Sequence, residues 1–375
     1  MAECHRASLR LSRASACRSR AGIAPAGRRR LVRCLRLTRK PILNRLLRFR
    51  QSFSLSFSLS FSLSLSLSLS RRRNLAGGLL LPLLLLLCCR WASAHDEHAK
   101  PPHLPFYVAT MGAQTIYVLG TLHVGDPADY PAYQPFRAPI INALTASPTL
   151  AFELSPDDIV MAPGSVNQYG VCAHDCLPHM LPAALWRSLA HRLRHNPAAL
   201  VQIRRMKPWL ASLLIETFSS SSAGLQTEYG TEAQLENVYL RGPILGLESM
   251  DDQMRAFTRL SLPEQWEMLA QDLQQSPAED VADVRELHAL WQAGDADKMA
   301  AWQVRKSAKL AQSMDLSNAI DEQILYRRNR RFVVKMLLIV TPNHPLFVAV
   351  GALHLGGPRG VLALLRGYGF SVKPM

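Results

Sequence analysis

The sequence predicts an α/β domain in which two related βα halves form a central mixed sheet flanked by helices, with a long helical insertion between the halves. Three observations lead to this class. Short apolar runs alternate with segments of helical periodicity from residue 106 onward. The segment 118–127 recurs without gaps at 349–358, each time at the end of an apolar run. Between the two copies, the stretch 250–340 has a mostly helical pattern.

The predicted strands are short apolar runs bounded by turn residues. Residues 106–110 and 115–119 predict a hairpin whose turn is 111–114. The later strands are 149–154, 243–247, 346–350 and 370–373. Helical spacing marks 181–195, 209–218, 359–367 and the stretch 250–340, which shows breaks near 262–263 and 293–295. Since the repeated segments lie near opposite ends of the domain, their strands are expected to meet at the centre of the sheet.

The N-terminal part does not have the pattern of a folded domain. Residues 1–70 combine an Arg-rich stretch with a Ser/Phe/Leu repeat, which indicates a disordered leader or an over-extended gene start. Residues 71–94 contain three arginines, a short apolar run and Ala92-Ser93-Ala94, the pattern of a secretory signal peptide. An uncleaved membrane anchor is the alternative. Residues 95–104 are a polar linker, and 105–375 form the predicted domain.

The distribution of charge argues against a nucleic-acid partner. The chain has a formal net charge of +15, but residues 1–94 hold 19 of the 43 Lys and Arg and only one acid. Residues 95–375 hold 24 basic and 27 acidic residues, and these form no basic stripe. We therefore expect no nucleic-acid binding, and contact with the membrane only through the signal peptide.

Two cysteines, Cys172 and Cys176, remain after cleavage at the predicted site. In an oxidising compartment an even number of cysteines favours a disulfide. The nearby His174 and His179 leave a metal site as the alternative, although the C-x-x-C spacing of most structural zinc sites is absent.

The repeat places one Gly-x-x-His turn after each of two strands. Gly120 and His123 stand in the first turn, and Gly351 and His354 in the second. Open α/β sheets bind ligands at the carboxyl ends of their strands, so the two imidazoles are expected at one sheet edge. Two imidazoles and one carboxylate with an open position form the usual catalytic metal site.

Two carboxylates follow predicted buried strands, Glu153 and Glu248. A buried carboxylate is costly unless it is paired or bound to a metal. One of them could ligate a metal and the other act as a general base or orient a ligand. Arg328 could bind a carboxylate or an oxyanion.

Structural roles compete with each of these functional ones. His123 and His354 could be hydrogen-bonded turn residues, and Glu153 belongs to an acidic stretch that could cap the next helix. Glu248 precedes Ser249, a candidate N-cap, so its charge could complement a helix dipole. Arg328 lies in an Arg-rich run that could be a solvated helix face.

Several of these motifs, in this order, resemble the TraB/GumN family, which includes the Tiki metalloproteases. The resemblance covers about 105–373. It rests on the two Gly-x-x-His turns, Phe152-Glu153, Gly246-Leu247-Glu248 and Arg328-Asn329-Arg330. The pieces Met206-Lys207-Pro208-Trp209 and 360–365 also match, whereas Leu353 and Arg327 depart from the usual pattern.

The resemblance implies an α/β fold of two repeats and a divalent ion such as Mn, Co or Zn. It implies His123 and His354 as metal ligands, Glu153 as the glutamate and Glu248 as a further candidate. Together with the residue patterns above, the expected metal ligands are His123, His354 and Glu153, and the expected catalytic residues are Glu153, Glu248 and Arg328. The expected function is a metal-dependent, peptidase-like hydrolase of the bacterial cell envelope. Its substrate would be a peptide or an ester, and the protein would be periplasmic or secreted. The alternatives are a non-catalytic envelope protein that binds haem, metal or polysaccharide, and a structural envelope factor.

Overall fold

The computed structural model describes residues 100–375. The predicted leader and signal peptide, and residues 95–99 of the predicted linker, lie outside the described residues. Among the described helices, none combines the length and the apolar character that crossing a bilayer requires.

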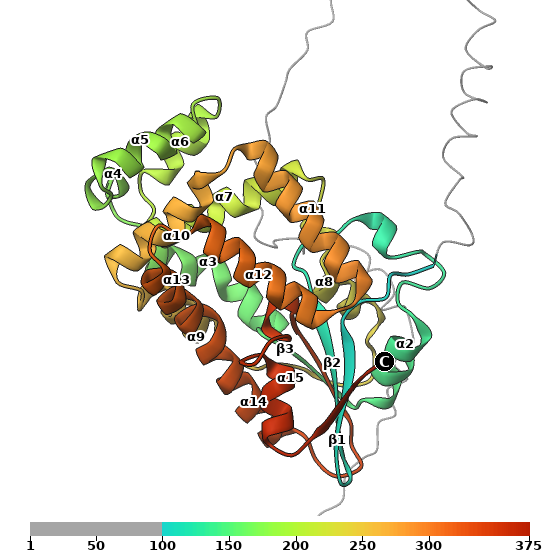
Figure 1. Ribbon diagram of the computed structural model, residues 1–375. Helices are drawn as coiled ribbons and strands as arrows, with labels where there is room; N and C mark the ends of the chain where they lie inside the picture. Colours follow the sequence, from blue (N-terminus) through green and yellow to red (C-terminus); the bar gives the residue numbers. More distant parts are fainter. Residues whose placement is uncertain (1–99) are drawn as a thin grey trace, which may run out of the picture. The chain divides into compact units, whose positions relative to one another are not determined.

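Six strands form one mixed sheet in the order β4-β3-β5-β2-β1-β6 (Figure 1). Strands β2, β5, β3 and β4 run parallel, and β1 pairs antiparallel with both β2 and β6. Their bounds are β1 Phe106–Met111, β2 Gln114–Thr121, β3 Thr149–Phe152, β4 Ile244–Gly246, β5 Leu346–Gly351 and β6 Ser371–Pro374. Each lies within about two residues of its predicted position, so the α/β class is confirmed.

The hairpin and the meeting of the repeats are both confirmed. Gly112, at φ +57°, supplies the left-handed turn residue between β1 and β2. At the sheet centre Gly120 of β2 lies opposite Val350 of β5 in parallel register. Because parallel strands end at the same edge, both Gly-x-x-His turns leave the sheet there.

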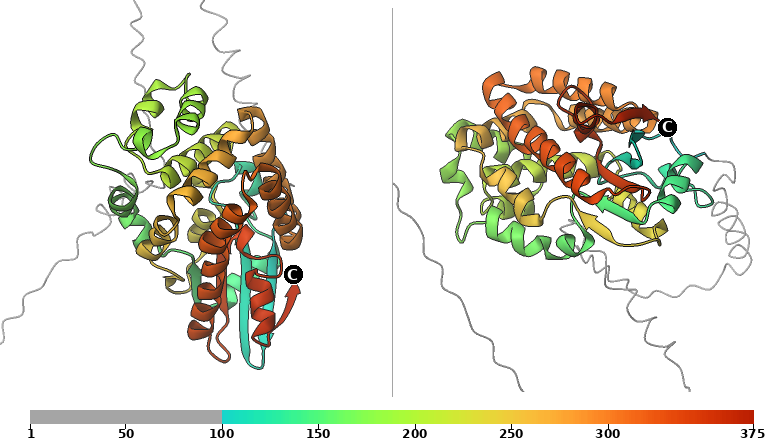
Figure 2. Two further views of the ribbon diagram at one scale, coloured as in Figure 1. Left: turned by 60° about the vertical axis from the view of Figure 1, so that its left-hand side comes forward. Right: turned by 90° about the horizontal axis from the view of Figure 1, so that it is seen from below.

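The side chains of β5 alternate between two apolar cores. Leu346, Val348 and Val350 pack in one core with helices α14 and α15, and Phe347 and Ala349 pack in the other with α2, α8, α11 and α12. A third apolar cluster lies among helices α3–α7, α9, α10 and α13. Figures 1 and 2 show α11 and α12 in orange and α14 and α15 in red.

Half of the described α-helices begin at a residue whose side chain caps their free N–H groups. Ser155, Asn196, Ser249, Ser261, Ser276, Asp295 and Ser313 each accept a backbone N–H at their helix. The helices are α2 Ala138–Ala146, α3 Pro156–Gly170, α4 Leu177–Met180, α5 Ala183–Arg192, α6 Pro197–Ile203, α7 Pro208–Ser222, α8 Thr231–Val238, α9 Met250–Thr258, α10 Leu262–Gln274, α11 Pro277–Ala293, α12 Ala296–Leu310, α13 Met314–Asp321, α14 Arg327–Ile339 and α15 Val361–Gly367.

The two predicted breaks divide the stretch 250–340 into three helices, but the structure has more helices there. The break near 262–263 is the start of α10, and the break near 293–295 is Gly294, at φ +82°, followed by the N-cap Asp295. Two further helix starts, at Ser276 and Ser313, were not predicted.

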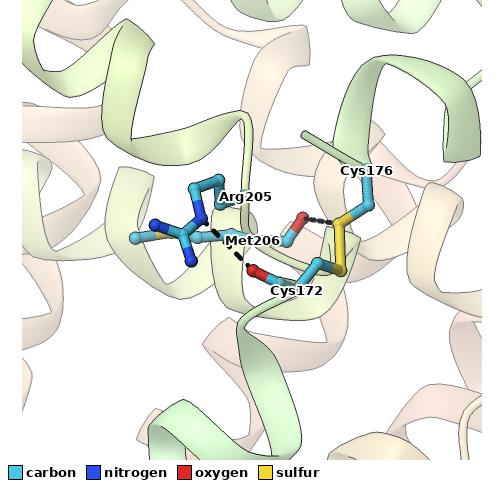
Figure 3. Close-up of a disulfide and its surroundings, with 4 residues drawn as sticks. All are labelled: Cys172, Cys176, Arg205 and Met206. Carbon is cyan, nitrogen blue, oxygen red and sulfur yellow. Dashed lines mark hydrogen bonds between the residues drawn. A yellow bond between two sulfur atoms is a disulfide. The ribbon is translucent and has the colours of Figure 1, made fainter. Parts of the chain in front are cut away.

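The disulfide between Cys172 and Cys176 closes the connection from α3 to α4 (Figure 3). The backbone N–H of Cys172 donates to Arg205 O at 2.7 Å, and that of Cys176 donates to Arg204 O at 2.9 Å. The disulfide therefore closes the loop on itself, and the main-chain hydrogen bonds tie the loop to the chain just before α7. The predicted disulfide is confirmed, and it lies in a helical region away from the strand ends (Figure 1).

Candidate functional site

The two predicted glutamates stand side by side at the carboxyl edge of the sheet. Main-chain hydrogen bonds continue beyond β3 and β4, from Leu247 N to Phe152 O at 2.8 Å and from Glu248 N to Glu153 O at 3.0 Å. Both side chains are buried. Two neighbouring buried carboxylates repel each other and lose their hydration, so a compensating group is needed.

Arg328 of α14 is that compensating group. Its Nη2 donates to Glu153 Oε2 and, at 2.6 Å, to Glu248 Oε1, while its Nε donates to Glu248 Oε1 at 3.0 Å. The guanidinium is itself buried. Of the two interpretations of Arg328, carboxylate binding is therefore correct and the solvated helix face is not.

A π-helical turn, η4 Glu322–Tyr326, leads directly into α14 and places Arg328. Turns of this kind are frequent at functional sites. The carbonyl of Ile324 in this turn accepts a hydrogen bond from Arg328 Nη1 at 3.1 Å. The guanidinium is thus held at three of its nitrogens, which fixes its plane against the two glutamates.

His354 joins the same buried cluster from the 3-10 turn η5 Ala352–His354 after β5. Its Nδ1 bonds to Oδ1 of Asn329, whose Nδ2 donates to Arg359 O at 3.0 Å. That second bond sets the orientation of the amide, so Nδ1 carries the proton and Nε2 keeps its lone pair. Nε2 lies 3.5 Å from Glu153 Oε1 and 3.4 Å from Arg328 Nη1.

The charge states follow from these surroundings. Burial, with the neighbouring Arg328, lowers the pKa of His354 to about 4 although Glu153 opposes the shift. Burial raises the pKa of Glu153, but Arg328, the two histidines and the Gly351 N–H outweigh it, so the pKa lies below the usual range. At neutral pH a neutral imidazole therefore faces an ionised carboxylate.

Gly351 is required for the approach of Glu153. Its N–H donates to Glu153 Oε1 at 2.8 Å, and a Cβ at this position would lie 3.1 Å from that oxygen. The glycine of the second motif thus makes space for the carboxylate. Gly120 serves packing instead, since a Cβ there would lie 2.8 Å from Leu355 Cδ1.

Glu248 differs from Glu153 in having one unsatisfied oxygen. Its Oε2 accepts no hydrogen bond from any described residue, and Arg331 Nη2 lies 3.7 Å away. Burial raises the pKa of Glu248 in spite of Arg328. Two neighbouring carboxyls with pKa values shifted in opposite directions are a common acid–base arrangement in enzymes.

His123 lies apart from this cluster and has a different partner. Its side chain is 71% exposed, and Nδ1 lies 3.2 Å from Oε1 of Glu232 on α8. The same carboxylate oxygen accepts a hydrogen bond from Thr121 at the end of β2. The Glu232 charge raises the pKa of His123, to an extent that solvent around the exposed imidazole limits.

The main chain fastens the first turn to α8. Thr231 N donates to Leu122 O at 2.9 Å, and Leu122 N donates to Thr231 Oγ1 at 3.1 Å. Gly230 lies so near that a Cβ there would come within 2.5 Å of His123 O. Glu232 and Asn329, the two residues that hold the imidazoles, were not predicted from the sequence.

The structure brings four of the five predicted site residues into contact: Glu153, Glu248, Arg328 and His354. His123 acts on Glu153 electrostatically but contacts Glu232. Within residues 100–375, no three His, Cys, Asp or Glu side chains stand close enough together to hold one ion. The set of three metal ligands therefore stays a prediction.

The donors present suit a divalent ion in kind. A neutral imidazole with an unprotonated Nε2 and a hydrogen-bond partner on Nδ1, as in His354, is the usual metal-binding form of histidine. It lies beside the ionised Glu153, whereas the exposed imidazole of His123 is paired with Glu232. Imidazole and carboxylate donors together are typical of Zn, Mn and Co sites.

The model of the TraB/PrgY/gumN family matches residues 105–374 of the chain. No curated protein and no solved structure matches it. The match spans both Gly-x-x-His turns, both glutamates and Arg328, and it covers well over half of the sequence. The chain belongs to the TraB/PrgY/gumN family.

Proposed function

We propose that the protein is a metal-dependent, peptidase-like hydrolase of the bacterial cell envelope, exported to the periplasm or beyond. The observation that supports it most is the neutral His354, with an unprotonated Nε2, beside the ionised Glu153. The first Gly-x-x-His turn, with His123, leaves the sheet at the same edge.

In this proposal His354, His123 and Glu153 hold the ion, which is Mn, Co or Zn. Such an ion polarises a carbonyl oxygen and makes water more acidic. Asn329 keeps His354 in the tautomer that presents Nε2, and Gly351 and Arg328 keep Glu153 ionised and oriented. Glu232 lies beside Nδ1 of His123, as Asn329 lies beside Nδ1 of His354.

Glu248 is the proposed proton carrier. In hydrolysis the attacking water loses a proton and the leaving amine or alcohol gains one. Burial favours the protonated form of Glu248, and its Oε2 has no hydrogen-bond donor among the described residues. This oxygen can therefore take up the proton and release it later, while Arg328 holds Oε1 in place.

The test is turnover of peptide and ester libraries by the chain from His95 onward, stripped with a chelator and resupplied with Mn, Co or Zn. We expect turnover that needs the ion and that Glu153→Gln or His354→Ala lowers by at least about a hundredfold. His344→Ala, an exposed histidine at the opposite end of β5, is the matched control and should keep full activity.

Turnover that persists without any divalent ion, or that survives both substitutions, would contradict the proposal. Stable binding of metal or haem without turnover of any substrate would also contradict it, and would favour the non-catalytic binding protein.

A further inference from the structure

The outer face of α14 carries a shallow groove that the reaction proposed above does not use. Its volume is about 370 Å³. The lining residues are Leu247, Arg327, Arg330, Arg331, Val334, Lys335 and Leu338. Six of these seven come from one helix at spacings of three and four residues, so they form one continuous stripe. The opposite face of α14, with Phe332, Val333 and Met336, is buried against the sheet.

The groove concentrates positive charge on a domain that is slightly acidic as a whole. Four of its side chains are cationic, and Arg330 pairs with Glu322 while Arg331 lies near Asp252 and Glu248. In the described part of the chain Arg327 and Lys335 form no salt bridge and are exposed. An anionic ligand is the chemistry that these free cations complement.

The groove also offers apolar surface. Val334 is 46% exposed and Leu338 is 76% exposed, although both are large hydrophobic residues. They lie toward the C-terminal end of the stripe, on either side of Lys335. The favoured ligand therefore carries apolar as well as negatively charged groups.

The spacing of the cations fits an extended peptide. Arg327, Arg331 and Lys335 follow one another at four residues, which is about 6 Å along a helix. Side chains on one face of an extended chain recur at about 6.6 Å. The whole stripe is about 16 Å long, which accommodates roughly five extended residues. A membrane surface has no such repeat.

One end of the groove adjoins the candidate site. Leu247 lines the groove, and the next residue is Glu248, whose Oε2 is buried and accepts no hydrogen bond from the described residues. Arg331 belongs to the groove and approaches that oxygen at 3.7 Å. A chain lying along α14 would thus reach the carboxyl edge of the sheet.

We propose that this groove binds the substrate, and that the substrate is an extended peptide with acidic residues at alternate positions. This inference rests on the proposed function for its link to catalysis, but the binding itself needs neither an ion nor turnover. The groove can therefore be tested on its own.

The experiment measures fluorescence anisotropy of a labelled hexapeptide that alternates aspartate and leucine, with the chain from His95 onward. A second hexapeptide carries lysine in place of aspartate. We expect the acidic peptide to bind at least about tenfold more tightly, and its binding to weaken as salt is raised. Arg327→Gln with Lys335→Gln should weaken it about tenfold, because two unpaired cations are removed.

The matched control is Arg187→Gln with Lys309→Gln, which removes the same charge from exposed positions on α5 and α12. It should leave binding of the acidic peptide unchanged. Equal binding of both peptides, or equal losses in the two double variants, would overturn the proposal. Binding to vesicles with anionic phospholipid but not to the acidic peptide would overturn it in favour of a membrane surface. If the acidic peptide binds as expected but no substrate is turned over, the proposed function is wrong and the groove remains a peptide-binding site.

Discussion

At the end of β2, the His123 side chain is 71% exposed and its Nδ1 faces the carboxylate of Glu232. At the end of β5, the His354 side chain is 8% exposed and its Nδ1 bonds to the amide of Asn329. The two turns share Gly, Leu, His, Gly and Pro at matching positions. Their surroundings nevertheless favour a charged imidazole in the first turn and a neutral one in the second.

The difference shows what a repeated motif fixes and what it leaves to the rest of the fold. Both copies bring a histidine to the same sheet edge, because both follow parallel strands that pair directly. The partner of each imidazole comes from a helix far away in sequence, α8 for His123 and α14 for His354. Such partners set exposure and protonation, which the motif alone does not determine.

Removal of Arg328 should have the largest effect on stability, because this guanidinium neutralises the two buried glutamates beside the second turn. Arg328→Met leaves Glu153 and Glu248 buried without a cation, so we expect a loss of about 3–5 kcal/mol in the free energy of unfolding. Chemical denaturation measures it. Arg330→Met is the control: its exposed pair with Glu322 should contribute less than about 1 kcal/mol. Equal losses in the two variants would mean that the buried cluster does not depend on this guanidinium.

The loop after the first turn should be sensitive to acid. Asp129 is buried and accepts hydrogen bonds from His288 at 2.8 Å, Gln292 at 2.6 Å and the backbone of Asp126 at 3.0 Å. Burial raises its pKa, but these bonds outweigh burial and the pKa is lowered. We expect Asp129→Asn to lose about 1.5–3 kcal/mol of unfolding free energy at neutral pH.

The sign of the pH dependence follows from the lowered pKa. The charged Asp129 stabilises the fold fully above its unfolded pKa of about 3.9, and this stabilisation is lost as pH falls through the lower folded value. The difference between the wild-type chain and Asp129→Asn should therefore shrink below about pH 4. Denaturation curves at several pH values test this, and a difference that stays constant down to pH 2 would contradict it.

The two motif glycines should respond differently to alanine. At Gly120 the new Cβ would meet Leu355 Cδ1 at 2.8 Å and the backbone of Ala352 at 3.1 Å, so we expect a loss of about 1–3 kcal/mol. At Gly351 its nearest contact is Glu153 Oε1 at 3.1 Å, which costs less stability but displaces the carboxylate. Gly164→Ala, in open space on α3, is the control and should be neutral or stabilising by thermal denaturation. A larger loss at Gly351 than at Gly120 would reverse the assigned roles.

The smallest effect concerns the imidazole of the first turn alone. Glu232→Gln removes the charge beside His123, so the His123 pKa should fall toward its ordinary value of 6.5. Nitrogen chemical shifts of the ring, followed by NMR over pH, measure it. His354, whose pKa is lowered to about 4, should keep its shifts over the same range and serves as the internal control. An unchanged His123 titration would show that Glu232 does not set its charge.

The sequence predicted the strands, the meeting of the repeats and four members of the buried cluster. These features have local signals, such as an apolar run that ends in Gly or Glu. Glu232 and Asn329 have none, because their roles depend on contacts with Thr121, 111 residues away, and with His354, 25 residues away. The helix start at Ser276 did carry a signal: a capping box with Glu279, followed by Pro277.

There is also a physical reason why the exposure of the His123 side chain could not be predicted from the sequence. The motif places its main chain, which Thr231 and Gly230 then hold in the turn. Whether the side chain then points to Glu153 or to Glu232 depends on the balance between two carboxylates. A sequence pattern contains no information about that balance.

The central claim is that both imidazoles and Glu153 serve one divalent ion, and titration calorimetry with Mn or Zn tests it most directly. The chain from His95 onward should bind one ion, and His123→Ala and His354→Ala should each weaken binding by at least about tenfold. His344→Ala should have no effect. If the variant lacking both His123 and His354 binds the ion as tightly as the wild-type chain, the two turns do not form a metal site.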